Sequence, residues 1–590
     1  MSDVLGSAAW STDPGHWRYA PLGNAGSPTQ GRFLLLGESQ IRGNLHIRPP
    51  LQHVISIAPT RSGKGVSLII PNLLTYRGSV LVVDPKGENA WITAAFRREA
   101  FGQETVILDP WGEVNRRYGA MAGATEPIAR FNPLSILDPD SDEYVDDLAY
   151  LADSIIISQS SRDPHWDDSA RELVAGLIAF VVESPAYRAD ASLGLVRGLL
   201  SLPGKELRVA IKDAQALGAG SIARAKLARF DADTNEINSV MSTARTQTGF
   251  LDSEVLTRNM AESDFSFEEL CRGNISIYLV LPPDKLQTYA RWLRLMVSIA
   301  IRAVAQAGRV SAPSRGGGAI RAVAPGGSQN PSGLPALFML DEFGTIGKLD
   351  AVAQAYGLMA GLGMIIWAFA QDLNQLKRDY PDHWETFIGN SQAMTCFGVM
   401  DNFTADYVSK MLGTQTIEHT NISTSIGQSV APLTAGSPFW KSQRTSSQSS
   451  TSSSTQMMSR PLMQPDEVRG LNGELCIIMG RFAPIISRRL VYHRDWRFLH
   501  CARPDPHFPR TEQVRWLALQ HRLMEAGSVA GLLAQEGYEV KKRWRGGWDV
   551  IGAAGKPAHN FASDDELWRW TYMLVMDGVD SARTLPSGAV

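Results

Sequence analysis

The stretch HVISIAPTRSGKGVSLIIPNLL, residues 53–74, decides the fold of this chain. Its apolar beginning, HVISIAP, predicts a buried strand, and the residues from Gly63 onward predict a helix. The segment between them follows the phosphate-loop pattern G-x-x-x-x-G-K-[ST], in which backbone N–H groups and a helix N-terminus surround phosphates. Two positions depart from that pattern. Ala58 replaces the first glycine, and Gly65 replaces the closing hydroxyl residue.

The remaining residue types in this loop suit contact with a nucleotide. Lys64 would reach the β- and γ-phosphates, and Gly63 permits close approach of the backbone. Ala58 is a mild change, whereas Gly65 removes the hydroxyl that normally holds Mg²⁺. A Gly/Ser-rich turn without a ligand is the alternative interpretation. The predicted nucleotide-binding residues are Thr60, Arg61, Ser62, Gly63, Lys64, Gly65 and Val66.

Further apolar runs indicate that this strand belongs to a parallel α/β sheet. Short buried strands alternate with helical stretches, which is typical of that fold class. The predicted strands lie within residues 78–89, 104–112, 275–282, 336–344 and 364–372.

Polar residues at the ends of two of these strands complete a candidate site. ALFMLDEFG, residues 336–344, ends in Asp341 and Glu342. The first acid would order the Mg²⁺ shell, and the second would orient and activate a water molecule. Gln371 follows the strand in MIIWAFAQD and would sense the γ-phosphate or position water. Solvated strand ends are the alternative for each.

A third group of polar residues follows the strand in VVDPKGEN. Asp84, Lys86 and Glu88 crowd its carboxyl end, the edge of an open α/β sheet where ligands bind. Water is the first candidate to replace the missing hydroxyl as a ligand of Mg²⁺, and Asp84 or Glu88 is the second. A plain surface turn is the alternative.

The pattern along the chain predicts several domains. Residues 51–139 and 263–500 form the predicted nucleotide-binding domain, preceded by an N-terminal segment at 1–50. Helical spacing of apolar residues over 140–262 predicts an all-α insertion. Two low-complexity segments, 308–335 and 421–460, predict mobile loops, the second one polar and disordered.

Residues 501–590 form a predicted C-terminal accessory module of α+β type. Within it, 537–552 alternates like a hairpin around Gly546-Gly547. Its basic run, KKRWRGGW, favours a solvated face over a nucleic-acid contact.

Composition excludes some classes of protein. The 590 residues are 44% hydrophobic and 20% charged with a net charge of −3, which indicates a globular chain not coated in basic residues. A basic channel on such a body remains compatible with nucleic-acid binding. The four cysteines form no C-x-x-C pair and predict reduced thiols. No apolar run reaches the length of a membrane helix, and no signal peptide is evident.

Together these segments resemble the TraG/TraD-like type IV coupling proteins, within the wider FtsK/HerA group of DNA-pumping ATPases. The resemblance covers roughly residues 5 to 500. The matching segments include HVISIAPTRSGKGVSLIIPNLLTYRGSVLVVDPKGEN, HWDDSARELVAGLI, LFMLDEFGTIGKLD, AQDLNQLKRDY and GNSQAMTCFGVMDNFTADYVSKMLGTQT. In this family the loop commonly ends G-K-G, so Gly65 looks like a family trait.

The resemblance implies the fold class α/β, with a RecA-like P-loop NTPase domain, an inserted all-α domain and a small C-terminal α+β module. It implies ATP and Mg²⁺ as cofactors, with Lys64 on phosphate, Asp341 on Mg²⁺, Glu342 activating water and Gln371 as sensor. It also implies a homo-hexameric ring. That ring would present DNA–relaxase complexes or effector proteins to a type IV secretion channel and contact DNA phosphates without sequence preference.

Two further expectations follow from this resemblance, and two alternative functions stay open. An arginine from a neighbouring subunit should touch the γ-phosphate, and Arg378 and Arg481 are the candidates. No apolar run corresponds to the family's usual N-terminal membrane helices, so we expect a cytoplasmic chain peripheral to the bacterial inner membrane through partners. The alternatives are that the anchor has been removed or lies on another polypeptide. The alternative functions are a cytosolic double-stranded DNA translocase and a non-hydrolysing scaffold that recruits substrates.

Overall fold

The structure is a computed structural model that describes most of the chain between residues 51 and 503 and parts of both ends. The described ranges are 7–9, 18–19, 33–39, 43–47, 51–119, 124–157, 165–310, 332–345, 347–358, 362–430, 445–471, 474–479, 482–495, 498, 501–503, 528–535, 537–543, 547–552, 559–562, 567, 570–571 and 574.

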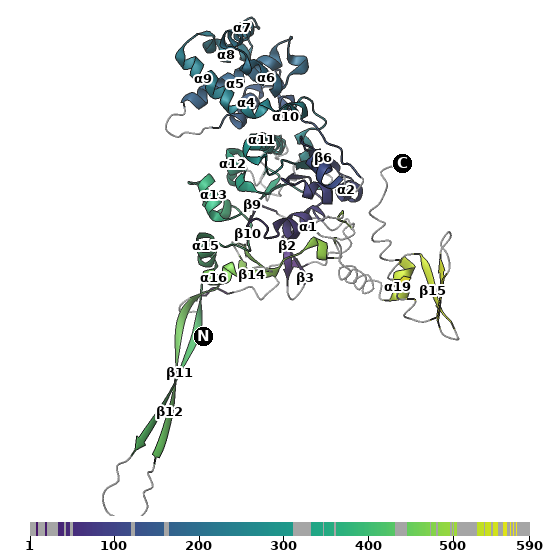
Figure 1. Cartoon of the computed structure of the whole chain (residues 1–590), viewed down its shortest axis with the longest axis vertical. Coiled ribbons are helices and arrows are strands. Elements are labelled where there is room, and N and C mark those ends of the chain that lie inside the picture. Colours follow the sequence, from purple (N-terminus) through teal and green to yellow (C-terminus); the bar gives the residue numbers. More distant parts are fainter. Residues whose placement is uncertain are drawn as a thin grey trace, which may run out of the picture.

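A twelve-stranded sheet forms the centre of the molecule, in the order β1-β3-β2-β14-β13-β10-β4-β9-β8-β5-β7-β6 (Figure 1). From β10 to β6 all neighbours are parallel, and from β13 to β1 they are antiparallel. The parallel strands are β4 (Val54–Ile57), β5 (Val80–Val83), β6 (Glu104–Leu108), β7 (Ile275–Leu279), β8 (Ala336–Leu340), β9 (Met364–Ala370) and β10 (Ala393–Cys396). The antiparallel strands are β1 (Arg18–Tyr19), β2 (Leu34–Ser39), β3 (Gly43–Ile47), β13 (Glu474–Met479) and β14 (Phe482–Arg488).

Helices cover both faces of the parallel strands, which explains why these strands read as continuous apolar runs. In β5, Leu81 and Val83 join one core cluster, while Val80 and Val82 join the other. The helices around the sheet are α1 (Ile70–Leu73), α2 (Glu88–Phe101), α11 (Leu286–Val310), α12 (Asp350–Leu358), α13 (Leu373–Asp379), α14 (Trp384–Gly389), α15 (Asn402–Leu412) and α16 (Pro465–Arg469).

The described residues from 140 to 262 contain helices and turns but no strand. These helices gather at one end of the molecule, where α4 packs against α11 (Figure 1). They are α4 (Tyr144–Ile155), α5 (His165–Glu183), α6 (Leu193–Ser201), α7 (Gly204–Gln215), α8 (Ile222–Leu227), α9 (Asn235–Gln247) and α10 (Glu254–Asn259). The predicted α/β fold with a helical insertion is confirmed.

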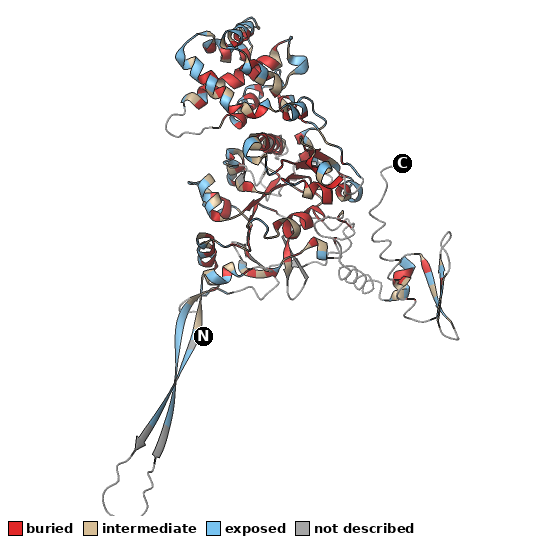
Figure 2. Cartoon of the chain, in the orientation of Figure 1, coloured by how far each residue is buried: buried red, intermediate tan, exposed pale blue. Residues whose placement is uncertain are grey.

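The predicted disordered segment at 421–460 is wrong for its described residues. Strands β11 (Thr414–Val430) and β12 (Thr445–Pro461) form one antiparallel hairpin paired along its whole length. Figure 2 shows that it extends away from the sheet, and most of the side chains described within it are exposed, apart from partly buried ones near its base. Each strand satisfies the backbone hydrogen-bonding groups of the other on its inner edge, so the hairpin forms without an apolar face. Most of the other predicted loop, 311–331, lies outside the described residues, and α11 occupies its first three positions.

The two ends of the chain differ in their relation to the sheet. Strands β1 to β3 belong to the main sheet, so the N-terminal segment is joined to the nucleotide-binding domain. Near the C-terminus, β15 (Tyr538–Lys542), β16 (Trp548–Gly552) and β17 (His559–Phe561) form a separate sheet beside α19 (Val529–Gln535). The predicted hairpin at 537–552 is therefore present, and Gly546 in its turn lies outside the described residues. Among the described residues, every helix is too short or too polar to cross a membrane.

Candidate nucleotide-binding site

The loop after β4 has the backbone of a phosphate-binding turn. Its start is fixed to the next strand, because the N–H of Ala58 donates to the Ala370 carbonyl at 2.9 Å. Arg61 and Gly63 have φ angles of 64° and 93°, which lie in the left-handed region that favours glycine. Among the described non-glycine residues only Arg61 and Glu342 have positive φ. Ala58 therefore replaces the usual glycine without backbone strain.

Gly65 opens the helical turn that follows the loop, a π-helical segment at Gly65–Ile69. A Cβ atom built on Gly65 would have no heavy atom within 4 Å. Steric crowding therefore does not explain why position 65 lacks a hydroxyl, because the structure leaves room for a serine or threonine there.

Lys64 is held between the two carboxylates at the end of β8. Its Nζ lies 2.9 Å from Asp341 Oδ1 and 2.7 Å from Glu342 Oε1. The amide of Gln371 donates to the other oxygen of Glu342 at 2.7 Å. Strand β9 lies between β4 and β8, so Lys64 reaches across it to the acids while Gln371 comes from its end. The structure therefore brings all four predicted catalytic and phosphate-contacting residues into one cluster.

The charges in this cluster stabilise one another. Burial acts to lower the pKa of Lys64, but the two carboxylates outweigh it and the pKa lies above its usual value. Burial acts to raise the pKa of Glu342, but Lys64 and the Gln371 amide together hold that pKa below its usual value. Burial raises the pKa of Asp341, although Lys64 opposes this.

Glu342 also has an unusual backbone, with a φ of 55°. A non-glycine residue in the left-handed region costs free energy of order 1 kcal/mol or more, and such residues cluster at functional sites. The turn aims the carboxylate at Lys64 and Gln371 while Asp341 Oδ1 accepts from the Glu342 N–H at 3.0 Å. The strain is consistent with a residue whose position matters for function.

Asp84 holds the turn that follows β5. One carboxylate oxygen accepts from the Ala90 N–H at 2.8 Å and the other from the Asn89 amide at 3.3 Å. Burial raises the pKa of Asp84 to about 8. These contacts fix the turn between β5 and α2, and a role of Asp84 on Mg²⁺ stays a prediction. Glu88, the first residue of α2, lines the same cavity.

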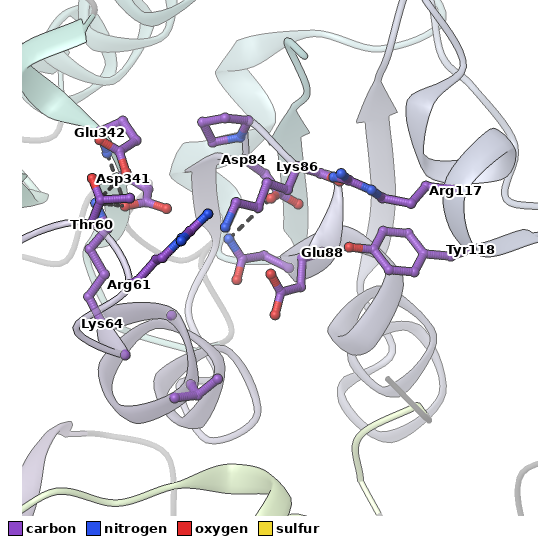
Figure 3. A pocket seen from close by; sticks show the side chains of 15 residues that line it. Thr60, Arg61, Lys64, Asp84, Lys86, Glu88, Arg117, Tyr118, Asp341 and Glu342 are labelled. Carbon is purple, nitrogen blue, oxygen red and sulfur yellow. Dashed lines mark hydrogen bonds and ion pairs between the residues drawn. The ribbon is translucent and has the colours of Figure 1, made fainter. Parts of the chain in front are cut away.

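One cavity of about 490 Å³ connects these elements (Figure 3). Most of the predicted site residues line it, whereas Ser62 and Gln371 do not. The Ser62 hydroxyl donates to the Pro59 carbonyl at 2.6 Å within the loop, and Gln371 acts through Glu342. The lining residues are Thr60, Arg61, Gly63, Lys64, Gly65, Val66, Asp84, Pro85, Lys86, Glu88, Asn89, Arg117, Tyr118, Asp341 and Glu342.

Sequence analysis missed Arg489, which supports the loop from the antiparallel half of the sheet. Its guanidinium donates to the Ser62 carbonyl and lies 5.2 Å from the centre of the Phe397 ring. A Cβ atom on Gly63 would lie 3.0 Å from this guanidinium, so only glycine fits comfortably there. No sequence signal connects Arg489 to the loop, because 427 residues separate it from Ser62.

Of the two arginines predicted to act on a neighbouring subunit, only Arg378 lies among the described residues. Arg378 is mostly exposed and pairs with Asp379 at 2.8 Å, which in this chain is a surface ion pair. Arg481 lies outside the described residues. The role of either in a neighbouring subunit stays a prediction.

The donors in the cavity fit a nucleotide-bound Mg²⁺ better than a metal held by protein alone. Among the described residues no group of three or more His, Cys, Asp or Glu side chains is arranged to hold a metal ion. Asp341 supplies one carboxylate beside the loop, and Gly65 supplies no hydroxyl. This matches the usual behaviour of Mg²⁺, which keeps several waters and binds substrate phosphates with one or two carboxylates.

The sequence is similar to those of known conjugal transfer proteins. The chain is 28% identical over 480 residues to the conjugal transfer protein TraG of Escherichia coli, covering 75% of this chain and 68% of that protein. It is 27% identical over 470 residues to the protein VirD4 of Agrobacterium fabrum (strain C58 / ATCC 33970), covering 77% and 61%.

Solved structures of the bacterial conjugative coupling protein TrwB share the fold. The unbound monoclinic form of TrwBdeltaN70 aligns with a TM-score of 0.52 at 15% identity, covering 75% of this chain and 86% of that one. TrwB in complex with ADP and Mg²⁺ aligns with a TM-score of 0.51 at 15% identity, covering 74% and 85%. Residues 22–515 match the family described as Type IV secretory system Conjugative DNA transfer. Because that match spans most of its length, the chain belongs to this family of conjugative coupling proteins.

Proposed function

We propose that this chain hydrolyses ATP at the Lys64 loop and uses the energy to drive transfer through a type IV secretion channel. The observation that carries the proposal is the cluster of Lys64, Asp341, Glu342 and Gln371 beside an open cavity. A cation from the loop after β4 and two carboxylates at the end of β8 are parts that phosphoryl transfer to water requires. The TrwB structure with ADP and Mg²⁺ supports the same ligands for this chain.

Mg²⁺, when bound, neutralises charge on the β- and γ-phosphate oxygens. Asp341, whose carboxylate lies 2.9 Å from Lys64 Nζ, would hold the water shell of that ion. Lys64 exchanges its two carboxylate contacts for phosphate oxygens, while the left-handed backbone at Arg61 and Gly63 shapes the loop around them. Binding therefore replaces one set of charge-assisted hydrogen bonds with another.

Hydrolysis then depends on Glu342. Without its contact to Lys64, the carboxylate accepts a hydrogen bond from water, and the Gln371 amide keeps it in place. The water oxygen bonds to the γ-phosphorus, the bond to the bridging oxygen breaks, and its electron pair leaves with ADP. The proton of the water passes to Glu342. Positioning and charge stabilisation account for the acceleration, without a covalent intermediate.

The cargo and assembly are part of the same proposal. The chain would recruit DNA–relaxase complexes or effector proteins, contact DNA through its phosphates, and work as a homo-hexameric ring. Phosphate contacts predict that DNA binding weakens steeply with salt and varies little with sequence. Light scattering with and without ATP and Mg²⁺ tests the ring.

Phosphate release by the purified chain tests the enzymatic core of the proposal. The wild type should turn over ATP, and Lys64→Ala should lose nucleotide binding together with turnover, because it removes the cation at the phosphates. Lys212→Ala is the matched control, since this lysine lies in the helical insertion and is 65% exposed. Unchanged turnover in Lys64→Ala would refute the site, and ATP-dependent rings without turnover would favour a scaffold.

A further inference from the structure

The turn DPKGEN between β5 and α2 is built rigidly around Asp84. Besides its two carboxylate contacts, the Asp84 carbonyl accepts from the Gly87 N–H at 3.1 Å. Gly87 has a φ of 67°, and a Cβ atom there would lie 2.7 Å from a Val114 methyl group. A larger residue would thus be strained twice over. The turn holds Lys86, one residue before this glycine, in a fixed backbone position.

The sheet places that turn beside the catalytic acids. Strands β5 and β8 are parallel neighbours, and Val83 at the end of one pairs with Leu340 at the end of the other. Asp84 and Asp341 are the next residues on each strand. Lys86 and Glu342 therefore leave the same edge of the sheet from adjacent strands, and both line the cavity (Figure 3).

The positive charge of Lys86 affects the carboxylate of Glu342 at this edge of the sheet. Burial and Lys64 have the largest effects on the pKa of Glu342, and Lys86 adds to the lowering of that pKa. Among the described residues, Lys86 has no acidic partner in an ion pair, and neither has Arg61, which also lines the cavity. Lys64 by contrast is neutralised by two carboxylates. Among the described residues, the cavity thus contains cationic side chains that form no ion pair with an acid, and Lys86 is one of them.

We propose that Lys86 is a catalytic residue that contacts the γ-phosphate from within the same chain. The inference rests on the proposed ATPase function. Charge builds on the γ-phosphate oxygens during transfer, and the exposed Lys86 side chain, carried by a turn of fixed backbone, supplies a cation that lowers the barrier there. Asp84 and Gly87 are positioning residues in this view, because they hold the turn that carries Lys86.

The test compares wild-type full-length chain with Lys86→Ala, Lys86→Arg and the exposed control Lys212→Ala. Without DNA, Lys86→Ala should lower kcat about 10²-fold, the size of losing one fixed transition-state donor. The KM for ATP should change less than about threefold, because the interaction forms mainly in the transition state. Lys86→Arg should recover much of kcat, and Lys212→Ala should match the wild type.

Binding of transition-state analogues separates this role from a structural one. Lys86→Ala should bind fluorescent ADP with Mg²⁺ as the wild type does, but should fail to retain ADP with aluminium fluoride. Equal loss of both ligands would overturn the inference in favour of a structural role. The inference would also be overturned if Lys86→Ala kept wild-type turnover without DNA and lost only the stimulation of turnover by DNA. That result would assign Lys86 to contacts with DNA phosphates. If the wild type itself had no turnover, the proposed function would fail and this inference with it.

Discussion

The ammonium nitrogen of Lys64 lies 2.7 Å from Oε1 of Glu342, although 278 residues separate the two in sequence. The same nitrogen contacts Asp341, so the loop that should receive phosphates is engaged with the acids of its own chain. In the proposed function, phosphate oxygens replace Glu342 as a partner of Lys64. Since the Lys64–Glu342 contact lowers the pKa of Glu342 and occupies one of its oxygens, its loss would make the carboxylate a better base. Nucleotide binding and activation of water would thereby be linked.

Glu342→Gln should separate nucleotide binding from hydrolysis. The amide keeps the size of the side chain but cannot accept a proton, so turnover should fall about 10²- to 10⁴-fold. ATP should still bind, because Lys64 loses one competing negative charge. Phosphate release and titration with a fluorescent ATP analogue measure the two effects. Glu236→Gln, at a 64% exposed position in the helical insertion, is the control. A Glu342→Gln variant that keeps wild-type turnover would rule out this base.

Gly65→Ser should fold normally and reduce the need for Mg²⁺. The added side chain enters open space, and serine is the better helix former by about 0.5 kcal/mol. Its hydroxyl could take the place of a water on the ion, so the half-saturating Mg²⁺ concentration for ATP hydrolysis should fall. A magnesium titration at fixed ATP measures this. The prediction fails if the half-saturating concentration rises in a variant of normal thermal stability.

Arg489→Ala should loosen the phosphate loop. It removes the hydrogen bond to the Ser62 carbonyl and the contact with the Phe397 ring. The KM for ATP should rise about tenfold, equivalent to the roughly 1.4 kcal/mol of a lost hydrogen bond. Amide hydrogen exchange at residues 60–65 should accelerate. Arg488→Ala, the exposed neighbour, should change neither. Unaltered exchange in Arg489→Ala would show that the loop holds its shape without this residue.

His53 should make the protein sensitive to acid. The side chain is fully buried, accepts from the Ile366 N–H at 3.0 Å, and contacts the Ala355 carbonyl through its other nitrogen. Burial lowers the pKa of His53 from 6.5 to about 4. Because the folded pKa is the lower one, this stability is complete above pH 6.5 and is lost as the pH falls toward 4.

The loss should amount to about 3 kcal/mol of unfolding free energy between pH 7 and pH 4. Urea unfolding at several pH values measures it. His53→Gln should be less stable at pH 7 but should lose less on acidification, whereas the exposed His165→Gln should follow the wild type. An equal loss in His53→Gln would assign the acid sensitivity to other groups.

Six of the seven parallel strands could be predicted because they are largely buried on both faces, whereas the short strand β10 is missing from the prediction. The run ALFML, for example, is β8 itself, and the acids after it mark the point where the strand reaches the edge of the sheet. The hairpin of β11 and β12 could not be predicted in this way, since its Ser- and Thr-rich strands have no apolar face. Its order comes from pairing between Thr414 and Pro461 and onward along both strands, which composition does not reveal.

Sequence alone determined the loop, the acids at the strand end and the family resemblance, because these depend on residue type and local spacing. Tertiary structure decided which charges meet. It paired Lys64 with Glu342 and bonded the Asp84 carboxylate to the turn that follows β5. It also placed Arg489, which follows β14 in the antiparallel half of the sheet, against the loop. It also left Lys86 beside the cavity without an acidic partner among the described residues. Such contacts depend on strand order and register, which local sequence patterns do not encode.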